Sequence, residues 1–331
     1  MRAIQVQVPG GPEALTLVDL PEPQPGPGQV RVRARAIGVG RPDVLIRNGT
    51  YKWMPPLPAI PGAEMAGVVD AVGEGVTHCK PGDRVLVSAR DLPVRGGCYA
   101  EAIVVPEAAP YHLPAAIDLA DAVSLPNLQL AQALLLGLAG GRLSARSVLI
   151  TGAAGGVATM LGQLAKHHGL QVIGTARSEE KRAYALVHGF DAVLDPAQPD
   201  LAGHVKALTE GRGVDLAFDP IGGRLFIDCL HALAPLGTAI SYNVVAGPPS
   251  EDVFKVLRSL LGRSLAVRCF SMHTFDEEAS ARRALMQSAI DLMAQGAVRA
   301  PRPTRMRLDQ ARDAHSVLDA GQTQGKIILE P

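Results

Sequence analysis

A glycine-rich turn, Gly152-Ala-Ala-Gly-Gly-Val-Ala158, holds the residues of this chain that are best suited to binding an anion. Gly155 and Gly156 lack a Cβ atom, so a ligand can approach the backbone closely there. The free N–H groups in the first turn of the helix that we expect to follow would point at an anionic group of that ligand. We therefore predict that a phosphate-bearing ligand lies against the backbone of Ala154, Gly155, Gly156, Val157 and Ala158.

The elements around this turn indicate how it is positioned. Ser147-Val-Leu-Ile-Thr151 is a short run rich in branched apolar residues, which predicts a buried strand. A helical pattern then runs through His168 and stops at Gly169, and residues 170–175 predict a second strand, so the unit is βαβ with a parallel sheet. In this context the turn is a variant of the dinucleotide fingerprint G-x-G-x-x-G/A. A glycine-rich turn can also serve tight packing alone, and the turn by itself leaves both interpretations open.

The end of the second strand indicates which dinucleotide would bind. An Asp or Glu there would hold the ribose hydroxyls of NAD, but the chain has no acid at this point. An Arg fork, a hydroxyl and a Lys instead suit the 2′-phosphate of NADP through charge-assisted hydrogen bonds. Ser178 could also simply cap a helix, which would leave Arg177 and Lys181 available. We predict NADPH as the cofactor, with its 2′-phosphate near Thr175, Arg177, Ser178 and Lys181.

The composition indicates a globular protein with no electrostatic preference for polyanions. At 331 residues the chain exceeds one ordinary domain, so we expect two. Apolar residues make up 47% of the chain and aromatic residues only 4%, which predicts an aliphatic core. Lys and Arg number 32, as do Asp and Glu, so nothing in the charge balance favours binding to nucleic acid or to a membrane surface.

The cysteines and the amino terminus favour a cytoplasmic protein. Four cysteines lie far apart and form no C-x-x-C pair, so we expect reduced thiols, several of them buried. Residues 1–8 alternate like a strand and contain no signal-peptide core. The most apolar window, residues 128–138, is too short to span a bilayer.

The order of elements predicts an α/β protein with two domains. Residues 1–122 read as short strands separated by Pro/Gly clusters, at 1–8, 15–19, 29–36, 66–72 and 84–87, and predict a compact β-rich domain. A helix over 123–138 should lead into the βαβ unit. Six strands then alternate with helices up to residue 270, at 147–151, 170–175, 192–194, 214–218, 238–242 and 265–268. Two βαβαβ halves of this kind make a doubly wound parallel sheet.

The remainder, residues 271–331, contains a helical pattern over 277–295 and one terminal strand over 325–329. An edge strand and a helix cannot form a core alone, so we expect them to pack on the amino-terminal domain. The predicted domains are therefore 1–122 with 271–331, and 123–270.

Five local sequences, in order along nearly the whole chain, resemble the zinc-free quinone oxidoreductase branch, the zeta-crystallin-like proteins, of the medium-chain dehydrogenase/reductase superfamily. They are Gly10-Gly-Pro-Glu-Ala-Leu15, Gly62-Ala-Glu-Met-Ala-Gly-Val-Val-Asp-Ala-Val-Gly73, Lys80-Pro-Gly-Asp-Arg-Val85, the Gly152 turn, and Ala314-His-Ser-Val-Leu318 with Gly325-Lys-Ile-Ile-Leu329. The resemblance implies a GroES-like catalytic domain followed by a Rossmann domain. It adds Tyr242, Asn243 and Phe270 to the expected cofactor contacts.

The same resemblance predicts that no metal is used. In the zinc alcohol dehydrogenases of the superfamily a Cys and a His occupy the positions of Gly40 and Ala63, and neither Gly nor Ala can ligate a metal. Without a Lewis acid the expected reaction is hydride delivery to an acceptor that is already electron-poor, such as a quinone or an enone. The substrate is thus predicted to be a small molecule.

Asp43 and Tyr51 are the polar residues that match the family around the expected substrate cleft. Tyr51 is the candidate proton donor, because a phenol can hydrogen-bond a carbonyl oxygen, but it could equally pack locally in its loop. Asp43 could fix its own loop through Arg47 at i+4 rather than take part in the chemistry.

Three functions stay open at this point. The first is an NADPH-dependent quinone reductase, the second a reductase of α,β-unsaturated carbonyls, and the third a nucleotide-binding protein without catalysis. The resemblance also implies a homodimer formed by extension of the Rossmann sheet through the apolar strand at 265–270.

Overall fold

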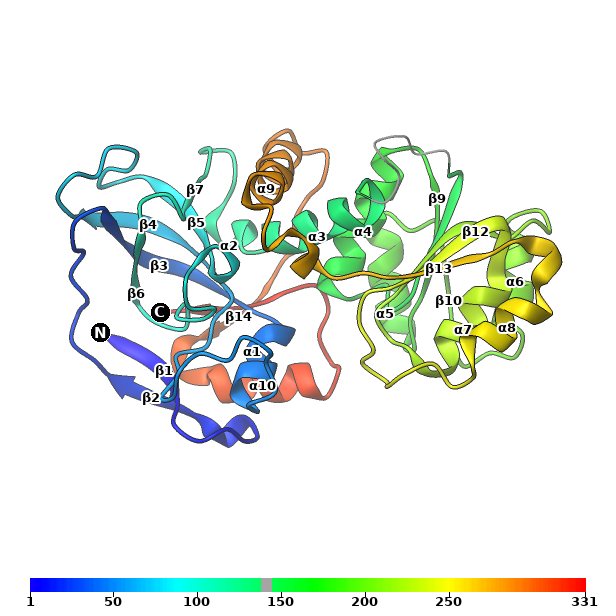
Figure 1. Ribbon diagram of the computed structural model, residues 1–331, viewed down its shortest axis with the longest axis horizontal. Coiled ribbons are helices and arrows are strands. Elements are labelled where there is room, and N and C mark those ends of the chain that lie inside the picture. The colour runs from blue at the N-terminus through cyan, green and yellow to red at the C-terminus, as the bar shows by residue number, and fades with distance from the viewer. Residues whose placement is uncertain (138–144) are drawn as a thin grey trace. The chain divides into compact units, whose positions relative to one another are not determined.

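The computed structural model describes residues 1–137 and 145–331 and divides them into two units. Unit 1 comprises residues 1–126, 279–296 and 300–331, and unit 2 comprises residues 127–278 and 297–299. Each unit is built around its own sheet (Figure 1). Among the described residues, no helix combines the length and the apolar character that crossing a bilayer requires. The four cysteines are free thiols, and all but Cys269 are buried.

Unit 2 contains a six-stranded sheet in the order β10-β9-β8-β11-β12-β13, in which every pairing is parallel. The strands are β8 (Ser147–Ile150), β9 (Gln171–Thr175), β10 (Ala192–Leu194), β11 (Val214–Asp219), β12 (Leu233–Ser241) and β13 (Ala266–Cys269). This confirms the predicted doubly wound sheet and all six of its strands. The helices are α3 (Leu125–Leu135), α4 (Gly156–His167), α5 (Glu179–Val187), α6 (Leu201–Leu208), α7 (Gly223–Ala232) and α8 (Val253–Ser259), with short 3-10 turns η3 (Leu261–Arg263) and η4 (Met272–Phe275).

The central strands of unit 2 form because their apolar runs are buried on both faces, as a parallel sheet requires. Leu149 and Ile173 from the sheet pack with Phe226 and Leu230 from α7 in one aliphatic cluster. Strand ends carry the polar residues, which leaves the carboxyl edge of the sheet as the place where chemistry is available.

Unit 1 contains a sheet in the order β14-β15-β3-β4-β5-β7, with β6 also paired to β3, and a separate hairpin of β1 and β2. Its strands are β1 (Arg2–Val6), β2 (Leu15–Asp19), β3 (Gln29–Val39), β4 (Glu64–Val72), β5 (Arg84–Ser88), β6 (Ala102–Pro106), β7 (Tyr111–His112), β14 (Thr304–Arg307) and β15 (Ile327–Glu330). Its helices are α1 (Arg41–Arg47), α2 (Leu119–Ala122), α9 (Ala279–Ala294) and α10 (Ala311–Asp319), with η1 (Pro12–Ala14), η2 (Ala89–Asp91) and η5 (Leu308–Gln310).

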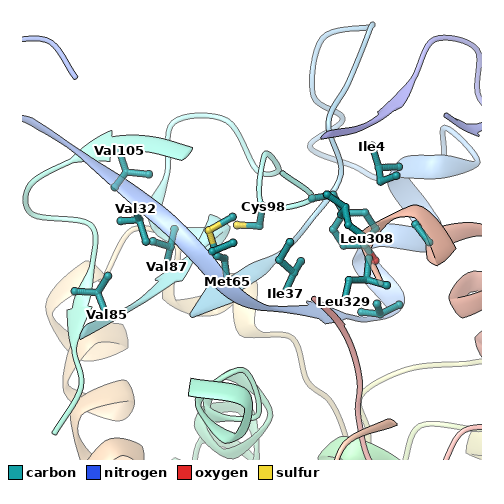
Figure 2. Packing of buried hydrophobic residues seen from close by; sticks show 14 of the residues in the cluster. Ile4, Val32, Ile37, Met65, Val85, Val87, Cys98, Val105, Leu308 and Leu329 are labelled. Carbon is teal, nitrogen blue, oxygen red and sulfur yellow. The ribbon is translucent and has the colours of Figure 1, made fainter. Parts of the chain in front are cut away.

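The core of unit 1 lies around the long strand β3, as Figure 2 shows. Val32 and Ile37 of β3 pack with Met65 of β4 and Val87 of β5, and Leu329 of β15 joins the same cluster. Residues that are more than 250 positions apart therefore share one core, because β15 pairs antiparallel with β3.

Several local expectations for unit 1 were wrong. The segment expected as a loop before Asp43 contains helix α1, which has Pro42 in its first turn and an N-terminal amide bound by the Asp43 carboxylate. The terminal strand β15 is not an edge strand, because β14 pairs with its outer side, and both β14 and α10 were missed. In unit 2, the helix expected over 123–138 is present as α3, over Leu125–Leu135, and residue 138 lies outside the described residues.

Leu236 provides a test of the backbone in β12. It lies in an irregular part of the strand, between the pairs Val214–Leu233 and Leu216–Thr238, with φ +64° and 78% of the residue exposed. The left-handed conformation costs a branched side chain about 1 kcal/mol, whereas Asn tolerates it. Leu236→Asn should therefore raise the melting temperature by roughly 2–4 °C in a thermal unfolding experiment.

Leu17→Asn is the matched control, because Leu17 is also an exposed strand residue, in β2 (46% exposed), but has no left-handed backbone. A Leu236→Asn variant that melts no higher than this control would contradict the strain at Leu236.

Candidate functional site

The glycine-rich turn joins β8 to α4 at the carboxyl edge of the unit 2 sheet. Gly152 has φ +63°, and a Cβ atom there would lie 3.3 Å from Cδ1 of Ile221, so a larger residue would be both strained and crowded. Gly155 precedes the helix as its cap residue, and its amide donates to the carbonyl of Gly152 over 2.9 Å. The Thr159 hydroxyl donates to the Gly155 carbonyl over 2.9 Å. These bonds hold the backbone of the turn in one shape.

The first turn of α4 begins at Gly156, as the sequence predicted. Helix geometry leaves the amides of Gly156, Val157 and Ala158 without intrahelical acceptors, and they point out of the helix end. Gly155, Gly156 and Val157 are partly exposed, whereas Ala154 and Ala158 are buried. This arrangement fits an anion such as a pyrophosphate, which needs donors and no intervening side chains.

The end of β9 lies directly beside this turn. The Ala153 amide donates to the Thr175 carbonyl over 2.9 Å, which connects the turn to β9. The Thr175 hydroxyl is buried, and among the described residues it has no hydrogen-bond partner. Arg177 and Ser178 are exposed.

Two cations stand together at the start of α5. Ser178 caps the helix by accepting from the Lys181 amide over 3.3 Å, as the simpler interpretation predicted. Burial and the neighbouring Arg177 guanidinium lower the pKa of Lys181. Like charges this close are unfavourable by themselves, and a bound dianion would relieve them. Capping and phosphate binding are therefore compatible in this geometry.

The other predicted cofactor residues follow β12 and β13. The Tyr242 amide donates to the carbonyl of Asp219 over 3.1 Å, and the Phe270 amide donates to the carbonyl of Ser241 over 2.8 Å. Asn243 is exposed, and its side-chain oxygen accepts from the Val244 amide over 2.9 Å. Burial and Asp219 raise the pKa of Tyr242, so its phenol stays neutral. Because the strands are parallel, these residues share one sheet edge with the glycine-rich turn.

Asp219, at the end of β11, is a polar residue of this edge that sequence reasoning missed. It is fully buried, and its carboxylate accepts from the hydroxyl of Thr151 and from the amide of Gly222. Burial raises the pKa of Asp219, and these hydrogen bonds oppose the rise. The available signal was an acid that follows the apolar run Leu216-Ala-Phe218, directly before Pro220-Ile-Gly-Gly223.

In unit 1, Asp43 lies on α1 and is fully buried. One of its oxygens accepts from the Gly40 amide over 2.8 Å and the other from the Gly62 amide over 3.1 Å. The carboxyl group thereby connects the segment that contains Gly40 with the segment that contains Gly62 and Ala63. Burial, together with the nearby Glu64, raises the pKa of Asp43 to about 7.

Arg47 does not pair with Asp43 as we had expected. Its guanidinium forms an ion pair with Asp319 of α10 over 2.9 Å and lies 3.3 Å from Nδ1 of His315. Because Arg can only donate, Nδ1 accepts, and the protonated Nε2 of His315 donates to the Tyr99 hydroxyl over 2.9 Å. Burial and Arg47 lower the pKa of His315 to about 4. Asp319 and His315 occupy the Arg47 guanidinium, and the amides of Gly40 and Gly62 donate to the Asp43 carboxylate.

A buried ion pair between Lys326 and Glu64 lies close to Gly40. A Cβ at Gly38 would come within 2.6 Å of a Glu64 oxygen and 2.9 Å of Cε of Lys326, so this part of β3 must be glycine. A Cβ at Gly40 would lie 3.8 Å from the Lys326 ammonium. The space beside Gly40 is thus surrounded by a cation and two carboxyl groups.

Tyr51 lies in the segment after α1, half-buried, with its ring 5.8 Å from that of Trp53. Its amide donates to the Leu45 carbonyl over 3.1 Å. Within residues 1–137 and 145–331 its hydroxyl has no hydrogen-bond partner. The backbone is therefore anchored while the phenol is available.

A separate pocket of about 410 Å³ lies on unit 1. Its lining comes from the loops at 55–60 and 92–97 and from β6, is mostly aliphatic, and includes neither Asp43 nor Tyr51.

Gly40 and Ala63 offer no metal ligand. Across the part of the chain that the structure describes, no group of three or more His, Cys, Asp and Glu side chains is arranged to hold a metal ion. That the protein works without zinc stays a prediction.

Comparison with known proteins identifies the family. A model of the "Zinc-binding dehydrogenase" family matches residues 156–295, and one of the "Alcohol dehydrogenase GroES-like domain" matches residues 26–115. A quinone oxidoreductase of Pseudomonas aeruginosa is 34% identical over 330 residues, which cover 100% of this chain and 99% of that protein.

Solved structures agree. The quinone oxidoreductase of Pseudomonas syringae pv. Tomato DC3000 has a TM-score of 0.87 at 32% identity, covering 100% of this chain and 99% of that one. The Escherichia coli quinone oxidoreductase complexed with NADPH has a TM-score of 0.84 at 28% identity, covering 100% of both chains. The chain belongs to the quinone oxidoreductase branch of the medium-chain dehydrogenase/reductase superfamily, as the resemblance predicted.

The pKa shifts of Asp43 and His315 predict the pH dependence of stability. The native state holds the Asp43 proton more tightly than the unfolded chain does, so this contribution to stability is lost as the pH rises from about 4 to 7. His315 acts oppositely, because the unfolded chain binds its proton more tightly, and stability rises between about pH 4 and 6.5. The two slopes offset each other in the wild type between pH 5 and 6.5.

Asp43→Asn removes the contribution of Asp43 to the pH dependence of the free energy of unfolding. Urea unfolding of this variant between pH 5 and 6.5 should show the free energy of unfolding rising with pH more steeply than in the wild type, by up to about 1.4 kcal/mol per pH unit. Equal slopes in the two proteins would contradict the assignment to Asp43, whatever the absolute loss of stability.

Proposed function

We propose that the protein is an NADPH-dependent reductase of quinones. The observation that carries the proposal is the cationic end of β9, where Arg177 and Lys181 stand together in the place of an acid. The quinone as acceptor is supported by membership in the quinone oxidoreductase branch and by relatives named for that activity.

In this proposal the chain's contribution to binding comes from the carboxyl edge of unit 2. The pyrophosphate accepts hydrogen bonds from the amides of residues 155–158, and the 2′-phosphate binds to Arg177, Ser178 and Lys181. Tyr242, Asn243 and Phe270 follow the strands that hold the other half of the dinucleotide. The buried, unpartnered Thr175 hydroxyl and the side-chain-free turn support the fit of such a group.

NADPH, when bound, supplies a hydride. The protein must orient the acceptor and provide for one proton. Tyr51 suits the second task, since its backbone is anchored and its hydroxyl is available among the described residues. A reduced quinone oxygen can also take its proton from water, so Tyr51 should assist this reaction and not be obligatory for it. Asp43, whose carboxyl group accepts from the amides of Gly40 and Gly62, holds in place the segments that contain those two glycines.

We also propose a homodimer formed through β13. This strand is an edge of the unit 2 sheet, and Ala266, Arg268 and Cys269 on it are exposed. Leu261 and Phe254, which precede it, are large exposed apolar residues. An uncovered edge with apolar neighbours favours pairing with a second copy of the chain.

The cofactor proposal predicts the effect of removing both cations. Arg177→Ala/Lys181→Ala should raise the Kd for NADPH by about 100-fold, because two charge-assisted hydrogen bonds are lost, and change the Kd for NADH by less than about threefold. Fluorescence titration measures both constants. Lys166→Ala is the control, because Lys166 lies in the last turn of α4, away from the glycine-rich turn. Equal weakening of both nucleotides, or a wild-type preference for NADH, would remove the proposal.

The acceptor is tested by following NADPH oxidation with ortho- and para-quinones beside linear and cyclic enones, in the wild type and in Tyr51→Phe. Quinones should turn over, with a loss in the variant far below the ~100-fold expected for an obligatory general acid. Chelators should leave the rate unchanged, and elemental analysis should find no stoichiometric zinc.

Other outcomes identify the alternatives. Reaction with enones alone, abolished by Tyr51→Phe, would establish a reductase of α,β-unsaturated carbonyls. Tight NADPH binding with no acceptor reduced would establish a nucleotide-binding protein.

Assembly is tested by light scattering at micromolar concentration. The expected mass is twice the 34.7 kDa of one chain or a higher multiple. A monomer mass would contradict pairing through β13.

A further inference from the structure

The carboxylate of Asp219 connects two turns at the carboxyl edge of the unit 2 sheet. One oxygen accepts from the hydroxyl of Thr151, the residue directly before the glycine-rich turn. The other accepts from the amide of Gly222 over 2.6 Å, within the turn Pro220-Ile-Gly-Gly223 after β11. The backbone supports the same junction, since the Thr151 amide donates to the Phe218 carbonyl over 3.0 Å.

This junction lies where the two halves of the sheet meet. In the order β10-β9-β8-β11-β12-β13, strands β8, β9 and β10 extend outward from β8 in one direction, and β11, β12 and β13 extend outward from β11 in the other. A dinucleotide crosses such a switch point, with one mononucleotide on each half. The Thr151–Asp219 hydrogen bond is therefore a side-chain link between the two halves at the edge where a dinucleotide would lie.

The turn after β11 has little freedom apart from this link. Gly222 has φ +78°, and a Cβ there would meet the Gly247 carbonyl at 2.1 Å. The Gly223 amide donates to the same carbonyl over 3.2 Å, and the Ala246 amide donates to the Ile221 carbonyl over 2.7 Å. Hydrogen bonds thus connect the turn to the loop after β12, which contains Asn243. Through its bonds with Gly222 and Thr151, Asp219 connects the turn after β11 and the loop after β12 to the glycine-rich turn.

We propose that Asp219 is a positioning residue that sets the nicotinamide half of the site in register with the pyrophosphate turn. The inference rests on the proposed binding of NADPH. A ligand that spans both halves gains its second set of contacts only if the two turns are held at a fixed separation. A ligand that occupies the adenosine half alone does not depend on the link.

The chemistry of the link makes the proposal testable with isosteric variants. In Asp219→Asn, the side-chain oxygen can still accept from the Gly222 amide, and the side-chain NH2 can donate to the Thr151 hydroxyl, which is able to accept. Thr151→Ser retains the hydroxyl. Thr151→Val and Asp219→Ala break the link, and Thr151→Val does so without changing the backbone hydrogen bond to Phe218.

The experiment measures two dissociation constants for each variant, that of NADPH and that of 2′,5′-ADP, which carries only the adenosine half. Thr151→Val should raise the Kd for NADPH by about tenfold, the cost of one hydrogen bond to a charged group, and Asp219→Ala by at least as much, because it also removes the bond from the Gly222 amide. Both variants should change the Kd for 2′,5′-ADP by less than about twofold. Thr151→Ser and Asp219→Asn should bind both ligands nearly as the wild type does. Thr151→Val/Asp219→Ala should be no weaker than the worse single variant, because both changes remove the same link.

Each other result decides against the proposal. If Thr151→Val raises the Kd for NADPH and the Kd for 2′,5′-ADP equally, the link has a general structural role. If Thr151→Val leaves the Kd for NADPH unchanged, the link has no role in binding. If Asp219→Ala no longer binds 2′,5′-ADP, the first half is itself damaged, and the comparison of Thr151→Val with Thr151→Ser decides. If the wild type binds neither ligand, the proposed function fails along with this inference. If the wild type binds both, the results for the variants test the role of Asp219 alone.

Discussion

Parallel strand pairing in unit 2 places the carboxyl ends of β8, β9, β11, β12 and β13 along one edge of the sheet. Every proposed cofactor contact depends on this arrangement, because the residues come from segments that span more than 100 positions of the chain. The central strands β8 and β9 are almost wholly buried until they reach the edge, where glycine turns and polar residues follow. The edge is therefore the one part of this sheet where backbone donors, cations and hydroxyls can face a ligand together.

Unit 1 depends on a different constraint, the burial of charge. Lys326 and Glu64 form an ion pair inside the unit, and Arg47 reaches Asp319 through the interior. Buried charges are tolerated only when they are paired and hydrogen-bonded, so these contacts restrict the positions of α1, β4 and α10. Asp43 adds a carboxyl group whose raised pKa makes the cluster sensitive to pH near neutrality.

The sequence predicted unit 2 well because its signals are local. Apolar runs such as 147–151 and 214–218 can form only buried strands in this context, and glycine at 152, 155 and 156 marks the turn. Unit 1 was harder to predict, because α1 has only seven residues and β14 has no apolar pattern. The contacts that define the sites are also long-range. Thr151 and Asp219 are 68 positions apart, and Tyr99 and His315 are 216 apart, so no spacing rule reveals them. The acceptor depends on the shape of several loops and cannot be read from any one of them.

The claim that β9 ends in a site for a doubly charged phosphate can be tested directly by ³¹P NMR of NADP⁺ bound to the wild-type protein. The 2′-phosphate of the free nucleotide gains a proton with a pKa of about 6. Next to Arg177 and Lys181 the dianion should be favoured, so the bound 2′-phosphate resonance should stay at its dianionic position down to about pH 5. A bound resonance that titrates as the free nucleotide does would contradict the account.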